Sequence, residues 1–134
     1  MAKSAKEKLN AEKASKTVVL EKDFAGVRKG QTLFIATPKI VDHYLREIPY
    51  GETRTIQRLR RDLARRHQCD ASCPVSTAIF IRVAAQAAID EMAEGAKTDA
   101  VTPFWRLLTG RDKITKKLEI DAQWLDTQRA SEKT

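Results

Sequence analysis

Apolar and polar residues recur at helical spacing over residues 74–92, the longest regular pattern in the chain. One broad side of the predicted helix is apolar and wide enough to form the centre of a small core: Phe80, Ile81, Ala84, Ala87, Ala88 and Met92. The opposite side carries a polar residue every four positions: Arg82, Gln86 and Asp90. Ala78 and Ala85 flank Arg82, so no bulky side chain blocks the approach of another molecule there. The pattern is typical of a DNA-reading helix and also of an ordinary core helix.

Two shorter helices are predicted ahead of this one. The first covers residues 37–48, with Thr37 as its cap, and its buried face is formed by Ile40, Val41, Tyr44, Leu45 and Ile48. The second covers residues 55–66, with Thr55 as its cap, and its apolar stripe consists of Ile56, Leu59 and Leu63. A short turn joins it to the helix over residues 74–92. Two helices joined in this way indicate a helix-turn-helix.

Strand patterns are shorter and lie on both sides of the helices. Residues 17–20 and 32–36 are β-branched or apolar runs that predict either a hairpin or an irregular leader packed on the domain. Residues 104–108 are predicted to form a strand, and residues 113–118 to return as a second strand after a turn. A last helix is predicted to begin at Asp121.

The fold class that follows is α+β, mainly α: a winged helix-turn-helix with a small β wing and an N-terminal extension. The folded domain is expected over residues 37–132. The extension over residues 1–36 is expected to be a basic flexible tail, disordered or weakly helical, followed by the hairpin or leader.

The charge distribution favours polyanions as partners. The 134 residues carry a net charge of +7. Six arginines against Asp62 give residues 54–66 a local charge of +5, and residues 106–117 carry +4. Spacings of three and four place part of the first group on one helix face: Arg54, Arg58, Arg61 and Arg65. A basic hairpin after a helix-turn-helix is typical of a DNA-binding wing, whereas the alternative reading of the arginine face is a solvated surface.

Several other classes of protein are not supported by the sequence. It has no secretory signal and no apolar run of membrane-spanning length, so a cytoplasmic protein with reduced thiols at Cys69 and Cys73 is expected. His67 and the two cysteines fit no common zinc motif, because no fourth ligand accompanies them. No catalytic triad, phosphate loop or carboxylate pair is present, so we expect no enzyme activity, cofactor or small-molecule substrate.

Three segments carry a resemblance to a known family: Ile-Pro-Tyr-Gly-Glu-Thr at residues 48–53, Ile-Arg-Val-Ala-Ala-Gln-Ala at residues 81–87, and Thr-Pro-Phe-Trp-Arg-Leu-Leu at residues 102–108. From Thr37 to about Ser131 the chain resembles the C-terminal, DNA-binding domain of O6-alkylguanine-DNA alkyltransferases and the alkyltransferase-like proteins. The resemblance implies a winged helix-turn-helix that binds the DNA minor groove and rotates a damaged base into a pocket.

The acceptor cysteine of the family is absent. Its Pro-Cys-His-Arg sequence is here Pro103-Phe104-Trp105-Arg106, and phenylalanine offers no thiolate for self-methylation. Alkyltransferase-like proteins also lack this cysteine and bind alkylated DNA without repairing it, so the resemblance to them is nearer. The tyrosine that assists base rotation in the family falls on Ile56, and no asparagine hinge is evident before Phe104.

The main hypothesis is a non-enzymatic protein that binds duplex DNA and senses alkylated or distorted bases. Arg82 and Gln86 are predicted to enter the groove. Phosphate contacts are predicted from the arginine face and the wing: Arg54, Arg58, Arg61, Arg65, Arg111, Lys113, Lys116 and Lys117. By the resemblance, Arg82 matches the arginine that fills the gap left by a flipped base. Phe104, Trp105 and Arg106 are the candidate base pocket, although a Phe-Trp pair is more often part of a core.

Two rival hypotheses remain at this point. The first is a protein-interaction module that keeps the fold and has lost DNA binding, with a repair or regulatory protein as its partner. The second is non-specific polyanion binding through residues 54–66 alone.

Overall fold

The computed structural model describes residues 3–133 and has an α+β fold in which helices predominate, as the sequence predicts. Its helices are α1 (Ala5–Asn10), α2 (Pro38–Glu47), α3 (Ile56–Arg66), α4 (Pro74–Ala93) and α5 (Ala122–Ser131). Its strands are β1 (Lys16–Val19), β2 (Thr32–Ile35) and β3 (Ala71–Ser72), and its 3₁₀ turns are η1 (Thr98–Ala100), η2 (Phe104–Arg106) and η3 (Thr115–Lys117). Within residues 3–133, no helix combines the length and the apolar character that crossing a membrane requires.

The helices begin where the capping residues predict. The Thr37 hydroxyl accepts a hydrogen bond from the Ile40 amide at 3.2 Å, and the Thr55 hydroxyl accepts one from the Arg58 amide at 3.0 Å. Asp121 caps α5 in the same manner. The prediction of a long helix from Pro74 is confirmed, and the tail contains a helical turn, α1, with a Ser4–Glu7 capping box. The predicted α3–turn–α4 arrangement is therefore present.

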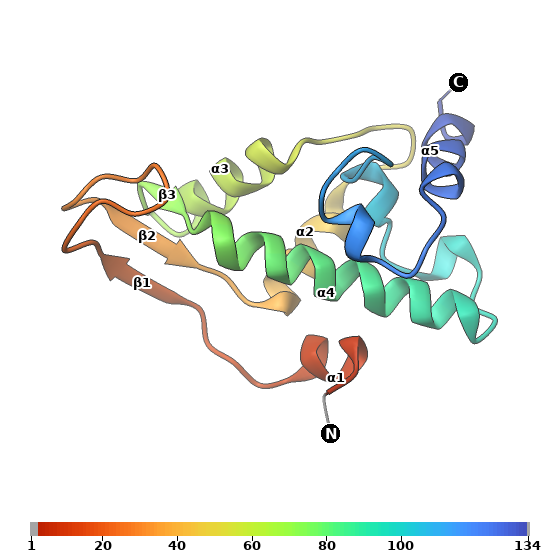
Figure 1. The fold of residues 1–134 in the computed structure, drawn as a ribbon, viewed down its shortest axis with the longest axis horizontal. Helices are drawn as coiled ribbons and strands as arrows, with labels where there is room; N and C mark the ends of the chain where they lie inside the picture. The colour runs from red at the N-terminus through yellow and green to blue at the C-terminus, as the bar shows by residue number, and fades with distance from the viewer. Residues whose placement is uncertain (1–2, 134) are drawn as a thin grey trace.

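Helix α4 runs through the middle of the molecule, with α1 and α2 packed against it (Figure 1). The core around it includes Tyr44, Leu45, Leu63, Ile81 and Leu108. One detail of the predicted pattern is wrong: Ala85, expected on the open side beside Arg82, is 0% exposed. The buried sector of α4 is wider than the one-sided pattern indicates, because other helices cover more than one of its sides.

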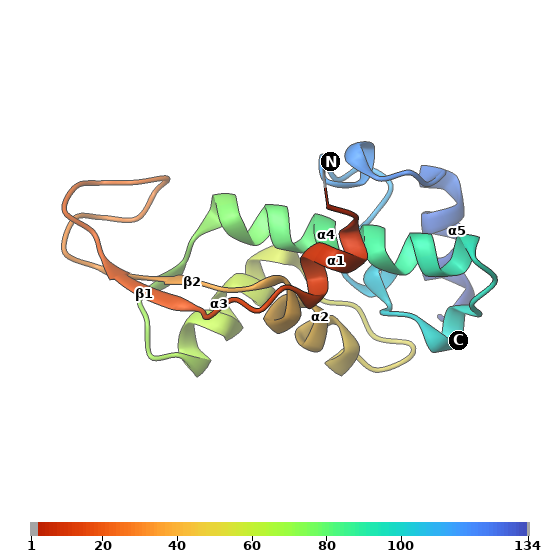
Figure 2. The same cartoon turned by 90° about the horizontal axis from the view of Figure 1, so that it is seen from below.

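The sheet is small and joins the N-terminal hairpin to the two helices of the helix-turn-helix. Strand β1 pairs antiparallel with β2, so the hairpin is confirmed, and β2 pairs parallel with β3, which lies between α3 and α4. The sequence analysis missed β3 because it has only two residues. Asp70, just before β3, accepts hydrogen bonds from the amide and hydroxyl of Thr32 at 2.8 and 3.0 Å. The hairpin projects beyond the helices at one end of the molecule (Figure 2).

The Asp70–Thr32 contact leads to a first prediction. Asp70→Ala should accelerate hydrogen exchange of the Thr32 amide, because that amide loses its carboxylate acceptor where β2 begins. The exchange rate of the Leu45 amide, in the middle of the core, serves as the internal control and should not change. Equal protection of Thr32 in the variant and the wild type would show that Asp70 does not hold the base of the hairpin.

The predicted β wing over residues 104–118 is wrong: these residues form η2, a turn and η3, and contain no strand. A strand would send alternate side chains to opposite faces. Here four of the five residues from Phe104 to Leu108 are buried, which fits a tight turn folded into the core. In η3, Thr115 and Leu118 point inward at a spacing of three. The basic residues of this segment are therefore displayed from a turn.

Candidate nucleic-acid interface

The arginines of α3, with Arg54 just before the helix, divide into two groups according to their partners. On the side facing α2, Arg66 forms a bidentate pair with Glu47 at 3.0 and 2.7 Å. Arg58 lies 3.4 Å from Asp62. The Arg54 guanidinium carbon is 5.2 Å from the centre of the Tyr44 ring. These three arginines are held by contacts within the protein.

Tyr44 organises this paired group. Its ring is fully buried, and its hydroxyl donates to Asp62 at 2.6 Å. Burial and this hydrogen bond raise the pKa of Tyr44. The same hydrogen bond, helped by the neighbouring Arg58, lowers the pKa of Asp62 despite its partial desolvation. Asp62 thus remains an ionised carboxylate that is paired with Arg58.

Replacing Tyr44 by phenylalanine should lower the free energy of unfolding by about 1.5–3 kcal/mol, the usual worth of a hydrogen bond to a charged group. Urea denaturation followed by circular dichroism measures this difference. The exposed Tyr50 provides the matched control, and Tyr50→Phe should leave the midpoint unchanged. Equal stability of the Tyr44 variant and the wild type would contradict a structural role for the hydroxyl.

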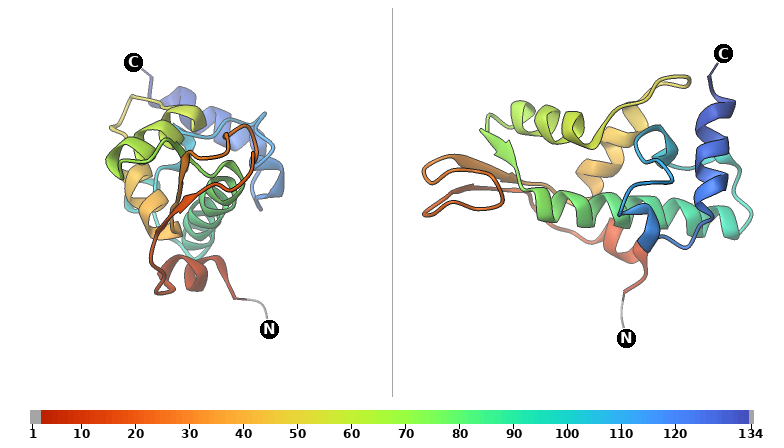
Figure 3. Two further views of the ribbon diagram at one scale, coloured as in Figure 1. Left: turned by 90° about the vertical axis from the view of Figure 1, so that its left-hand side faces the viewer. Right: turned by 45° about the horizontal axis from the view of Figure 1, so that its top comes forward.

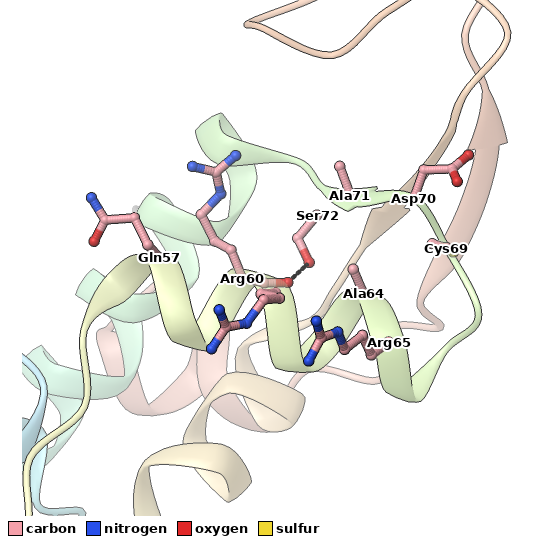
Figure 4. A pocket seen from close by; sticks show the side chains of 9 residues that line it. Gln57, Arg60, Ala64, Arg65, Cys69, Asp70, Ala71 and Ser72 are labelled. Atoms are coloured by element: carbon pink, nitrogen blue, oxygen red, sulfur yellow. Dashed lines mark hydrogen bonds between the residues drawn. The ribbon is translucent and has the colours of Figure 1, made fainter.

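The second group of arginines borders a groove between α3 and β3 of about 420 Å³ (Figure 4). The groove is lined by Gln57, Arg60, Arg61, Ala64, Arg65, Cys69, Asp70, Ala71 and Ser72. No carboxylate lies within ion-pair distance of its three arginines in residues 3–133. The only acid in the lining, Asp70, is hydrogen-bonded to Thr32. The groove therefore presents three unpaired guanidinium groups.

Arg60 is half-buried, whereas the other two arginines are exposed. Its carbonyl accepts a 2.6 Å hydrogen bond from the Ser72 hydroxyl, and its side chain extends away from α3 in Figure 4. Its Nε atom is buried and has no partner among the described residues. A buried donor without an acceptor is costly, and this nitrogen is closed to a ligand in the present arrangement of the side chain.

The sequence analysis identified Arg61 and Arg65 of this groove and missed Arg60 and Gln57. The helical stripe that selected the other arginines excludes Arg60, which is next to Arg61 in the sequence and about 100° away around the helix. The parallel pairing of β3 places Ser72 against α3 at this point, and no sequence pattern indicated it.

A second basic cluster forms where η3 lies beside α4. Arg82, Lys113 and Lys117 line one pocket together with Ala78, Ile79 and Ile114. Two of the four basic residues expected on the wing, Lys113 and Lys117, thus lie beside Arg82, although the segment is not a wing. Arg111 and Lys116 are exposed and do not line this pocket. We call Arg82, Lys113 and Lys117 the Arg82 cluster.

Gln86 is held within the protein. Its amide nitrogen donates to Asp90 at 2.8 Å, and its amide oxygen accepts from the Glu119 backbone at 3.0 Å. Helix α1 lies alongside: Ala5 and Lys8 border a small pocket with Arg82 and Gln86. The amide groups needed to read a base edge are therefore already satisfied.

The candidate base pocket lies inside the core. Phe104 and Trp105 are 0% and 1% exposed, and their rings pack edge to face at 5.3 Å. The Trp105 indole donates to Glu132 at 2.9 Å, and Arg106 donates to Glu132 at 2.8 Å and to the Ile48 carbonyl at 2.8 Å. These residues tie the end of α5 to the core, and neither ring is open to a base.

The residues with metal-ligand character are separated by the fold. The His67 ring stacks on Phe34 at 3.9 Å, the Cys69 thiol lies 3.4 Å from the Thr17 hydroxyl, and Cys73 caps α4. Within residues 3–133, no group of three His, Cys, Asp or Glu side chains is placed to hold a metal ion.

Comparisons with protein-family models, with curated proteins and with solved structures found no match to this chain.

Proposed function

We propose that this protein is a non-enzymatic DNA-binding protein of the alkyltransferase-like type. The observation that carries the proposal is the groove between α3 and β3, where Arg60, Arg61 and Arg65 have no acidic partner among residues 3–133. Guanidinium groups bind phosphate oxygens in bidentate fashion. The groove is formed by the first helix of a helix-turn-helix, the element that crosses the DNA backbone in such proteins.

The Arg82 cluster supports the same proposal from the second helix. Arg82 is exposed on α4, and Lys113 and Lys117 lie beside it. By the resemblance, this arginine matches the one that fills the gap left by a flipped base. Phosphate contacts from the lysines would orient the duplex against α4 without reading its sequence.

A preference for alkylated bases rests on the resemblance alone. The rings at the position of the family's acceptor site are enclosed in the core, and Ile56 stands where the family has its tyrosine. The proposal is therefore duplex binding through the backbone, with lesion sensing as a second, separately tested property.

The alternative function is a protein-interaction module. Two observations favour it: the amide nitrogen and oxygen of Gln86 each have a hydrogen-bond partner within the protein, and α1 packs beside Arg82 on α4. Non-specific polyanion binding is the third candidate and is favoured by the exposed arginines of α3.

Arg82→Ala separates these candidates. Fluorescence anisotropy on a labelled duplex should show about a tenfold loss of affinity, since groove contacts by arginine are worth about 1–3 kcal/mol. Arg46→Ala is the control, because Arg46 is an exposed arginine already paired with Asp42. Unchanged binding by the Arg82 variant would mean that α4 does not read DNA.

The same assay distinguishes the ligands. A duplex with one O6-methylguanine that binds more tightly than the plain duplex would establish lesion sensing. Equal competition by heparin, RNA and duplex DNA would leave polyanion binding only.

A further inference from the structure

The N-terminal hairpin carries a basic tip that the sequence analysis did not assign. Residues 20–31, between β1 and β2, project from one end of the molecule (Figure 3). Lys22, Arg28 and Lys29 are exposed there, and none of them forms an ion pair with an acid of residues 3–133. Glu21 and Asp23 lie in the same loop, so its net charge is +1. Phe24, 41% exposed, stands among them. Exposed cations on a projecting element are suited to contact a nucleic-acid backbone, and only their display can favour it here, because the net charge of the loop is small.

The loop has a defined shape. Phe24 and Val27 exchange two backbone hydrogen bonds of 2.8 Å around Ala25 and Gly26, whose φ angles of 48° and 86° form a tight two-residue turn. The Asp23 carboxylate accepts from the Lys29 amide at 2.8 Å, so this acid is engaged within the loop. The cations are thus displayed from an ordered element.

The loop is also fastened to the helix-turn-helix. Val27 is buried against Leu33 and Cys73, and Cys73 caps α4. At the base of the hairpin, Thr32 is hydrogen-bonded to Asp70, which lines the groove of the unpaired arginines. The hairpin and this groove therefore meet at the same residue.

We propose that the hairpin of β1 and β2 is the wing of this protein, binding the DNA backbone next to the phosphates held by the α3–β3 groove. A two-stranded ribbon fits the major groove of duplex DNA, and each cation would neutralise one phosphate. The wing thus lies N-terminal to the helices, attached through β3, rather than at residues 104–118. This inference rests on the proposed function.

The triple variant Lys22→Gln, Arg28→Gln, Lys29→Gln tests the inference by anisotropy on plain duplex across a salt series. We expect at least about a tenfold loss of affinity at moderate salt. The log–log salt slope should become shallower by about 2–3, because each lost phosphate contact reduces it by about 0.9. The control triple Lys39→Gln, Lys97→Gln, Lys133→Gln has the same change in charge on exposed residues outside the hairpin and both basic clusters.

The results have separate meanings. Equal losses in the two triples would reduce the effect to net charge and overturn the wing. Loss of affinity in groove variants with an unaffected hairpin triple would overturn the wing and retain DNA binding. No wild-type binding would remove the proposed function, and the wing with it. If the hairpin triple variant keeps wild-type affinity for duplex DNA but no longer binds a protein partner, the hairpin makes protein contacts instead.

Discussion

Replacing Glu132 by alanine is expected to lower the free energy of unfolding by about 3–5 kcal/mol, as expected when one partner of a buried ion pair is removed. The carboxylate is buried and accepts from the Trp105 indole and from two nitrogens of Arg106 at 2.8 and 3.1 Å. Removing it leaves the Arg106 guanidinium, itself largely buried, without its counter-charge and the indole without an acceptor. Urea denaturation followed by tryptophan fluorescence measures the loss.

The neighbouring Lys133 supplies the control, because it is exposed and Lys133→Ala should leave stability unchanged. A loss below about 1 kcal/mol in the Glu132 variant would mean that solvent replaces the carboxylate at little cost, against the assigned role.

The pH dependence of stability follows from the same contacts. Burial by itself would raise the pKa of Glu132, but the hydrogen bonds from Arg106 and Trp105 outweigh it and lower the pKa below its ordinary value of 4.5. A lowered pKa in the folded state means that the stabilisation is present above the unfolded pKa and is lost as pH falls through the folded pKa. Wild-type stability should therefore fall more steeply than that of Glu132→Gln below about pH 5.

The second large effect concerns binding. The double variant Arg61→Gln, Arg65→Gln should weaken duplex affinity by about tenfold to a hundredfold at moderate salt and reduce the log–log salt slope by about 1.8, corresponding to two phosphates. Both side chains are exposed in the groove and have no acidic partner in residues 3–133, so their charge is available to a ligand.

The matched control lies on the same helix. Arg58→Gln, Arg66→Gln removes the same charge, but these arginines are already occupied by Asp62 and Glu47. Its effect on the salt slope should be small. Equal slopes for the two double variants would contradict the division of α3 into paired and unpaired arginines.

The sequence predicts the helices well because their signals are local. Threonine caps at Thr37 and Thr55 and the aspartate before α5 act on amides within three residues, and each is observed. Strand β3 depends on pairing with β2, distant in the chain, and two residues give no periodic signal. Residues 104–108 alternate poorly for a strand, and their burial on consecutive positions is decided by α5 and the core.

The candidate site is predicted less well for the same reason. Helical spacing groups Arg54, Arg58, Arg61 and Arg65, but α2 decides which of these arginines are occupied, through Tyr44 and by fixing Asp62. Spacing within one helix contains no information about such partners.

The central claim is that this chain binds duplex DNA through its unpaired cations. Fluorescence anisotropy of the wild-type protein on a labelled plain duplex, across a salt series, tests it most directly. We expect binding near physiological salt, with the logarithm of the affinity falling linearly with the logarithm of the salt concentration. The slope should be about −0.9 for each phosphate neutralised, and steeper than −3 for the groove and the Arg82 cluster together. No binding near physiological salt would contradict the claim and favour the protein-interaction module.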